Sequence, residues 1–265
     1  MNLVVLGSGT AVPHPQRASS GHWLEVNGGS LLLDCSAAVV HRMAQENLDW
    51  VGLDAIWISH FHLDHVGGLA PLLFGTKHAP QTQSRRKPLT IFGGHGLETL
   101  FRAFDEANDY RLLKQPFPVE IREVSPREEF EILPGLKART FSTPHTRESL
   151  ALRLEDERGT SLVYTSDTGY TAALAKFAAG VDLFVMECSF PRDKPVETHL
   201  ELADAMRLAQ KAEPRKVMLA HLYPEWDGID LVVEAKKLWP GETRAATDGL
   251  RLSINKTERK ETSIL

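Results

Sequence analysis

Residues 59–68 read Ser-His-Phe-His-Leu-Asp-His-Val-Gly-Gly, and they directly follow the apolar run Ala-Ile-Trp-Ile at positions 55–58. The apolar run predicts a buried strand, so the polar residues stand just past a strand end. Alternate residues of an extended loop point to the same side, and His60 and His62 can therefore present two imidazoles to one metal ion. The stretch predicts a metal site at the end of this strand.

The second half of the same motif offers ligands for a neighbouring ion. Asp64 and His65 open the next predicted helix and can face a second ion beside the first, while Phe61 and Leu63 are expected to point away and to pack. Without a metal, polar side chains in such an apolar neighbourhood would lose hydrogen bonds at a cost of about 1–3 kcal/mol each. The motif therefore indicates metal binding rather than a structural role.

Three later segments repeat the pattern of a strand followed by a polar residue. His145, Asp167 and His221 each come shortly after an apolar, β-branched run. A single residue of this kind is more often a capped or hydrogen-bonded core residue than a ligand. Their repetition in company with the motif at 59–68 favours one shared site.

Short apolar runs alternate with longer amphipathic runs along the chain, which is typical of an α/β protein whose sheets are covered by helices. Strands are predicted near residues 2–6, 22–26, 30–34, 54–58, 89–92, 118–124, 136–141, 149–154, 161–165, 182–186, 215–219 and 250–254. Helices are predicted at about 36–47, 65–77, 95–107, 170–178, 199–212 and 228–238. No linker-like stretch interrupts this order, so we expect a single domain over residues 1–255 and a polar C-terminal tail over 256–265.

The composition is that of a globular protein, with 42% hydrophobic residues, 25% charged residues and a formal net charge of −5. This charge argues against a protein that holds long nucleic acids by general electrostatics, and the basic cluster at 85–87 is expected to lie in a solvated loop. Two cysteines, Cys35 and Cys188, are too few for a disulfide scaffold. No run approaches the roughly 18 apolar residues that span a bilayer, and no charged leader precedes the first strand. We therefore expect a cytoplasmic protein that does not enter a membrane.

The order of the motifs resembles the ligand series of the metallo-β-lactamase superfamily, with Asp34 at a strand end as its first member. The match runs from residue 3 to residue 254. It implies a four-layer αββα sandwich, in which two sheets lie face to face and the site lies at one edge between them. By this resemblance the first ion would be held by His60, His62 and His145, the second by Asp64, His65 and His221, and Asp167 would bridge them.

The resemblance implies two divalent ions, and their nitrogen and oxygen ligands suit Zn²⁺ without excluding Mn²⁺, Fe or Ni²⁺. Two adjacent cations would lower the pKa of a shared water toward neutrality, so that hydroxide could attack the substrate at neutral pH. Asp64, or the hydroxide itself, would accept or orient the proton. Asp34 is expected to fix an imidazole or a loop amide behind the ligands, although a plain strand-end carboxylate explains it nearly as well.

Three other segments resemble the ribonuclease Z group of phosphodiesterases within this superfamily. They are Leu-Gly-Ser-Gly-Thr-Ala-Val-Pro at 6–13, Val-Met-Glu-Cys-Ser-Phe at 185–190 and Thr-His-Leu-Glu at 198–201. By this resemblance His199 is the general acid that protonates the leaving oxygen, and Glu187 orients it. The alternative is a capping box, in which Thr198 and Glu201 begin the helix predicted at 199–212.

Two features depart from the ribonuclease Z group. Met186 stands where the group has a histidine before the strand glutamate. The group's long tRNA-gripping arm lies between the strand-end histidine and the bridging aspartate, yet His145 and Asp167 are only 22 positions apart. This spacing resembles that of arm-less relatives that cleave small phosphodiesters, although their cysteine-rich zinc site near the N-terminus is missing here.

The expected function is a dinuclear metal-dependent hydrolase, a phosphodiesterase that acts on small or nucleotide-like phosphodiesters. Two alternatives stay open. One is a tRNA 3′-processing endonuclease of the ribonuclease Z type, and the other is a non-catalytic metal-binding or ligand-binding protein on the same scaffold. Long nucleic acid is not the expected partner, and the resemblance suggests a homodimer.

Overall fold

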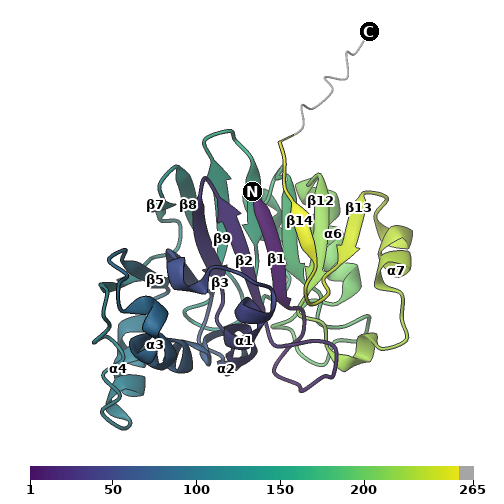
Figure 1. The fold of residues 1–265 in the computed structure, drawn as a ribbon. Coiled ribbons are helices and arrows are strands. Elements are labelled where there is room, and N and C mark those ends of the chain that lie inside the picture. Colours follow the sequence, from purple (N-terminus) through teal and green to yellow (C-terminus); the bar gives the residue numbers. More distant parts are fainter. Residues whose placement is uncertain (257–265) are drawn as a thin grey trace.

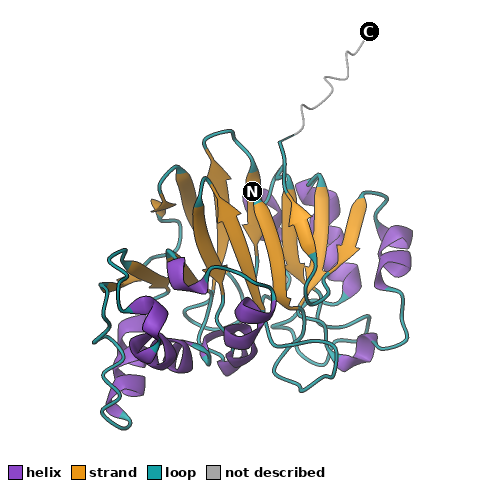
Figure 2. Ribbon diagram, viewed as in Figure 1, coloured by secondary structure: helices purple, strands orange, loops and turns teal. Residues whose placement is uncertain are grey.

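Two seven-stranded β-sheets lie face to face, with helices on their outer sides (Figure 1). The computed structural model describes residues 1–256 of the chain, so the tail expected at 256–265 lies outside the described residues apart from Lys256. Figure 2 shows the strands gathered at the centre of the molecule and the helices to either side. This arrangement confirms the αββα sandwich that the sequence predicted.

The first sheet contains the N-terminal part of the chain and one strand from near its other end, in the order β14-β1-β2-β3-β4-β5-β6. Its first four strands pair antiparallel, and β3 to β6 pair parallel. The strands are β1 (Asn2–Gly7), β2 (Gly21–Val26), β3 (Gly29–Leu33), β4 (Ala55–Ile58), β5 (Leu89–Gly93), β6 (Val119–Glu123) and β14 (Arg251–Ser253).

The second sheet has the order β13-β12-β11-β10-β9-β8-β7. Strands β7 to β10 pair antiparallel, and β10 to β13 pair parallel. The strands are β7 (Glu129–Leu133), β8 (Leu136–Ser142), β9 (Leu150–Asp156), β10 (Ser161–Tyr164), β11 (Leu183–Glu187), β12 (Lys216–Ala220) and β13 (Glu242–Ala245). Because β8, β10, β11 and β12 run in one direction, the loops after them meet at one edge of the sheet.

Helices from the first half of the chain pack on the first sheet, and those from the second half pack on the second sheet. The first set is α1 (Ala37–Gln45), α2 (Leu63–Val66), α3 (Leu69–His78) and α4 (Leu97–Glu106). The second set is α5 (Ala172–Phe177), α6 (Leu202–Ala212) and α7 (Leu231–Leu238). Single turns of 3₁₀ helix lie at Trp50–Gly52, Pro80–Thr82 and Pro224–Trp226.

Successive side chains of a strand point to opposite faces of the sheet. The core therefore consists of one apolar layer between the two sheets and one layer under each set of helices. In β4, Trp57 faces the other sheet, whereas Ile56 and Ile58 face the helices. In β11, Val185 lies between the sheets and Met186 lies in the apolar layer under the helices. Strands buried on both faces read as continuous apolar runs, as these do. Met186 is therefore a core residue here, in place of the histidine that the ribonuclease Z group has.

Several predicted boundaries were wrong. Strands β7 and β13, which lie at the two edges of the second sheet, were not predicted. The single helix predicted at 65–77 is two helices that break at Gly67 and Gly68. A Cβ on Gly68 would lie 2.2 Å from the carbonyl oxygen of Ser36, so the close approach of α1 and its preceding loop requires glycine at the break.

The basic cluster at 85–87 is not simply a solvated loop. Arg85 is only 8% exposed, and its guanidinium donates hydrogen bonds to the carbonyl oxygens of Val51 at 2.6 Å and Leu53 at 2.7 Å. Arg85 therefore ties the loop before β4 to the loop before β5. Both cysteines are buried free thiols. Among residues 1–256, no helix is long and apolar enough to cross a membrane.

Candidate metal centre

Three residues just past strand ends adopt the left-handed backbone conformation. They are Asp34 after β3, Ser166 after β10 and His221 after β12, with φ of 60°, 50° and 56°. This conformation is uncommon for residues other than glycine, and it concentrates at functional sites where the surrounding structure holds it in place. All three residues contribute side chains to the cluster described below.

The first group of possible ligands contains His60, His62, His145 and Asp167, whose ligand atoms all lie within 4.8 Å of one another. The Oδ2 atom of Asp167 lies 3.7 Å from Nε2 of His60 and 3.6 Å from Nε2 of His145. The Nδ1 atom of His62 lies 3.1 Å from Nε2 of His145. The loop after β4 and the loop after β8 thus bring their imidazoles together across the two sheets.

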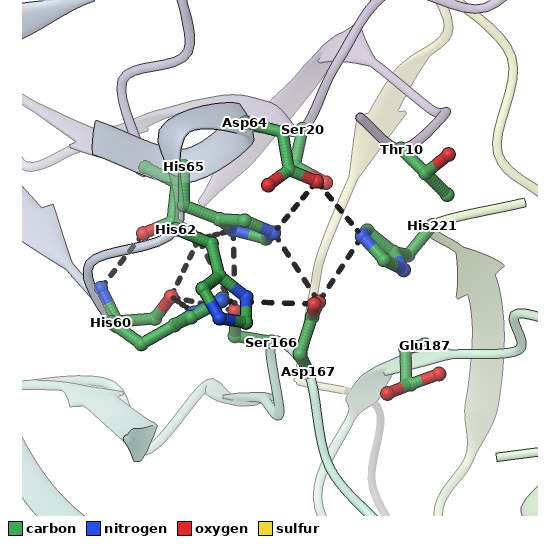
Figure 3. A network of polar contacts seen from close by, with 12 residues as sticks. Thr10, Ser20, His60, His62, Asp64, His65, Ser166, Asp167, Glu187 and His221 are labelled. Carbon is green, nitrogen blue, oxygen red and sulfur yellow. Dashed lines mark hydrogen bonds and ion pairs between the residues drawn. The ribbon is translucent and has the colours of Figure 1, made fainter. Parts of the chain in front are cut away.

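The second group contains Asp64, His65 and His221. The Oδ2 atom of Asp64 lies 3.4 Å from Nε2 of His221 and 3.6 Å from Nε2 of His65. The Oδ1 atom of Asp167 lies 3.3 Å and 3.4 Å from the same two nitrogens. Asp167 therefore turns one oxygen toward each group, which is the geometry of a bridging ligand (Figure 3).

Several nitrogen and oxygen atoms of the cluster lack hydrogen-bond partners and are of the types that bind metal ions. Among the described residues, Nε2 of His60, Nε2 of His65 and Oδ1 of Asp167 are buried with no hydrogen-bond partner. Burial lowers the pKa of His60 to about 3, which keeps its imidazole neutral and able to bind a cation. Burial would raise the pKa of Asp64, but the hydrogen bond from His221 and the charge of His65 outweigh it and lower the pKa to about 2. Ionised carboxylates beside imidazole nitrogens that lack hydrogen-bond partners form a set of ligand atoms that a divalent cation satisfies.

Asp34 lies behind the candidate ligands as a hydrogen-bond acceptor for five donors, one of which is the hydroxyl of Ser166 at 3.3 Å. Nδ1 of His65 donates to it at 2.8 Å and the hydroxyl of Tyr164 donates at 2.6 Å. The backbone N–H and the hydroxyl of Ser59 each donate at 2.8 Å. Asp34 thus holds both an imidazole and the first amide of the motif loop, which is more than a plain strand-end carboxylate does.

His199 lies against both groups of ligands and is 9% exposed. Its ring stacks on that of His221 with centroids 5.5 Å apart, and its centroid lies 4.9 Å from that of His145. Nδ1 of His199 lies 2.9 Å from Oε1 of Glu187. Burial would lower the pKa of His199, but the hydrogen bond and the charge of Glu187 raise it above its ordinary value.

The capping-box alternative for this segment was wrong. Helix α6 begins at Leu202, its N-cap residue is Glu201, and no side chain caps it. Thr198 uses its carbonyl oxygen to accept a hydrogen bond from Nδ1 of His145 at 3.0 Å. The segment is thus a loop that packs against the ligand groups, and His199 lies outside the helix.

Some residues of the site were missed or misplaced from the sequence. The hydroxyl groups of Ser59, Ser166, Ser189 and Tyr164 connect the carboxylates and imidazoles. No spacing rule could have found them, because small hydroxyl residues are common at strand ends. Leu63 was expected to pack, but it is 71% exposed, since it occupies the outer face of the one-turn helix α2.

Known proteins resemble this chain over nearly its whole length. YhfI of Bacillus subtilis (strain 168), described as a probable metallo-hydrolase, is 28% identical over 253 residues, which cover 94% of this chain and 98% of YhfI. The crystal structure of YhfI, described as a metallo-β-lactamase fold protein, has a TM-score of 0.79 at 25% identity and covers 95% of this chain and 98% of its own.

Two further matches are a ribonuclease Z in sequence and a diphosphatase in fold. A ribonuclease Z of Ignicoccus hospitalis is 28% identical over 306 residues, with 96% of this chain and 98% of that protein covered. Because 306 exceeds the 265 residues of this chain, the relative contains segments with no counterpart here. The structure of a diphosphatase from the PhnP family has a TM-score of 0.73 at 21% identity over 96% of this chain and 98% of its own, which shows a common fold.

The family model described as the anti-Pycsar protein Apyc1 matches residues 1–237. This range contains both ligand groups, Asp34, Glu187 and His199. The comparisons confirm the resemblance to the metallo-β-lactamase superfamily that the sequence suggested, and they leave the non-catalytic alternative without support. The chain is a metal-dependent hydrolase of the metallo-β-lactamase fold, and it belongs to the family of the anti-Pycsar protein Apyc1.

Proposed function

We propose that this hydrolase is a phosphodiesterase that cleaves small or nucleotide-like phosphodiesters with two divalent ions, of which zinc is our first choice. The observation that carries the proposal is the position of His199 beside both ligand groups, with its Nδ1 held by Glu187. Cleavage of a phosphodiester with a poor leaving group needs a proton on the departing oxygen. An imidazole in this position can give that proton.

The ligand roles follow the two groups. The first ion would be held by His60, His62 and His145, the second by Asp64, His65 and His221, with Asp167 between them. Mn²⁺, Fe and Ni²⁺ accept the same donor types. When bound, such ions would supply positive charge beside the phosphate and lower the pKa of a water molecule toward neutrality.

Residues of the protein would perform the proton transfers. Nδ1 of His199 is engaged by Glu187, so Nε2 is the nitrogen that would donate a proton to the leaving oxygen. Glu187 holds that tautomer and keeps the imidazole protonated to higher pH, since it raises the pKa of His199 against the effect of burial. Asp64 would orient the proton of the attacking water through its carboxylate, which a pKa of about 2 keeps ionised.

The length of the chain between the two groups supports a small substrate. Between His145 and Asp167 the chain forms only β9, a tight turn and β10. No segment there can extend to grip a tRNA, and the net charge of −5 supplies no general attraction for one. The ribonuclease Z relative supports phosphodiester chemistry, and the short connection favours a substrate smaller than the one its name implies.

A substrate panel with metal analysis tests the proposal. Purified protein would be analysed for bound metal and assayed on bis(p-nitrophenyl) phosphate, a dinucleoside monophosphate, a precursor tRNA, a lactam and a thioester. We expect hydrolysis of the two small phosphodiesters, loss of activity on chelation, and loss of activity in His221→Ala. Wild-type protein that hydrolyses the small diesters no faster than His221→Ala would overturn the proposal. Cleavage of the precursor tRNA with strong salt dependence would replace it with the endonuclease.

A further inference from the structure

Two carboxylates, one from each sheet, make the same pattern of contacts behind the ligand groups. Asp34 follows β3 in the first sheet, and Glu187 ends β11 in the second sheet. Each accepts a hydrogen bond directly from Nδ1 of a histidine: Asp34 from His65 at 2.8 Å, and Glu187 from His199 at 2.9 Å. Each also accepts a hydrogen bond from a buried serine.

The serines extend each carboxylate to a second histidine. The hydroxyl of Ser59 donates to Asp34 at 2.8 Å and lies 3.1 Å from Nδ1 of His60. The hydroxyl of Ser189 donates to Glu187 at 2.6 Å and lies 3.1 Å from Nδ1 of His221. The same sequence of carboxylate, serine hydroxyl and imidazole therefore occurs twice.

The count of hydrogens fixes the direction of the bond between each serine and its carboxylate. A carboxylate can only accept, and a serine hydroxyl has one hydrogen to donate. Asp34 and Glu187 each take several donors, and Glu187 also accepts from the backbone N–H groups of Thr168 at 2.7 Å and Leu200 at 3.1 Å. A hydroxyl this close to a carboxylate must donate its hydrogen to it, so toward the histidine the serine oxygen can only accept. The oxygen of Ser59 also lies 2.6 Å from the hydroxyl of Ser166, and that of Ser189 lies 3.3 Å from Nδ1 of His199.

It follows that His60 and His221 carry their hydrogen on Nδ1 and leave Nε2 bare. In both residues Nε2 is the atom that faces the ligand groups. It lies 3.7 Å from Oδ2 of Asp167 in His60, and 3.4 Å from Oδ1 of Asp167 in His221. The bare nitrogen is the form that binds a metal ion, and hydrogen bonds to the other nitrogen are what hold a histidine in that form.

We infer that Ser59 and Ser189 are positioning residues that set the tautomer of one histidine ligand in each group. Ser59 prepares His60 in the first group, and Ser189 prepares His221 in the second group. Ser189 also connects the second group to His199, because both His199 and Ser189 are bonded to Glu187. The inference rests on the ligand roles in the proposed function, and it assigns a separate metal site to each serine.

Removal of either hydroxyl would leave Nδ1 of a buried histidine without its acceptor. Ser59, Ser189 and His60 are fully buried and His221 nearly so, so bulk water cannot replace the lost partner. Loss of an outer hydrogen-bond partner of a ligand typically weakens metal binding about 10–100-fold. Ser59→Ala should therefore weaken one ion and Ser189→Ala the other, whereas threonine at either position keeps the hydroxyl and should restore binding.

The test measures zinc affinity and histidine tautomers in the whole chain. Zinc would be titrated against a competing chelator to obtain two dissociation constants for wild type, Ser59→Ala, Ser189→Ala and the two threonine variants. His62→Ala and Asp64→Ala identify which binding step belongs to which group. Ser161→Ala is the matched control, because Ser161 is also buried and bonded to a carboxylate, that of Asp182, but at the opposite end of β10.

We expect each alanine variant to weaken only its own binding step about 10–100-fold, with near-native binding in Ser161→Ala. Nitrogen NMR of the histidine rings should show that the Nδ1-protonated form of His60 or His221 is lost in the matching alanine variant and restored by threonine. Folded alanine variants that keep both zinc constants, or that both weaken the same step, would overturn the inference. A wild type without two zinc-binding steps would overturn it together with the ligand roles. If each serine variant weakens its own zinc-binding step but the protein cleaves no phosphodiester, the inference stands and the proposed function is wrong.

Discussion

Gly169 lies where two loops of the site touch, and an alanine there should displace the residue that we propose as general acid. An alanine Cβ would lie 2.2 Å from the carbonyl oxygen of Glu197 and 3.2 Å from that of Pro144. Real Cβ atoms essentially never come within 3.0 Å of such an atom, so the Glu197 carbonyl must move by roughly 1 Å. Glu197 is two residues before His199 in the same loop, so the imidazole is expected to move with it.

A misplacement of about 1 Å can lower a catalytic rate about 10²-fold. We therefore expect kcat of Gly169→Ala to fall about 10²-fold on a diester with an alkoxide leaving group, measured with saturating zinc. The fall should be smaller on bis(p-nitrophenyl) phosphate, because nitrophenolate leaves without much help from an acid.

Gly75→Ala is the matched control for this substitution. Gly75 lies inside α3, and a Cβ there meets nothing within 4 Å. Alanine favours a helix over glycine by about 1 kcal/mol, so this variant should keep wild-type rates and melt no earlier. If folded Gly169→Ala retains the wild-type kcat on both substrates, or loses equally on both, the link from Gly169 to His199 is wrong.

Three further predictions concern the proton donor and the fold. His199→Ala should lower kcat on the alkoxide substrate about 10²–10⁴-fold and much less on the nitrophenyl diester, whereas equal losses would give His199 a structural role. Glu187 raises the pKa of His199, and a general acid works only below its pKa. The alkaline limb of the kcat–pH profile should therefore move to lower pH in Glu187→Gln, and a limb that does not move would contradict the pairing of Glu187 with His199. Arg85→Met should lower the free energy of unfolding in urea by about 2 kcal/mol or more, because the buried carbonyl of Leu53 and the partly buried carbonyl of Val51 lose their donor. Unchanged stability in Arg85→Met would mean that water replaces the guanidinium.

The placement of the candidate metal ligands could be predicted from the sequence because it depends on local order along the chain. His60, His62, Asp64 and His65 share one loop and one helical turn, and their spacing decides which side chains face the same way. The distant partners also follow strand ends, and strands that run in one direction end at one edge of the sheet. The position of each residue relative to a strand end was therefore enough to predict which side chains lie close together.

The supporting contacts could not be predicted because they depend on packing between distant segments. Ser59 and Ser166 lie 2.6 Å apart but 107 positions apart in the sequence, and nothing local marks either hydroxyl. Arg85 reads as part of a solvated basic run, but four backbone carbonyls converge on its guanidinium. The helix break at Gly68 likewise depends on contact with Ser36, which propensity alone does not reveal.

Each ligand group takes side chains from both halves of the molecule. In the first group, His60 and His62 come from the first sheet and His145 from the second; in the second group, Asp64 and His65 come from the first sheet and His221 from the second. An ion at either position would thus cross-link the two halves, which are also joined by apolar contacts and by hydrogen bonds such as that from Tyr164 to Asp34. Because an unfolded chain does not present such a site, the binding free energy of the metal adds to the free energy of folding. Removal of the metal should therefore weaken the association of the two halves at the same time as it stops the reaction.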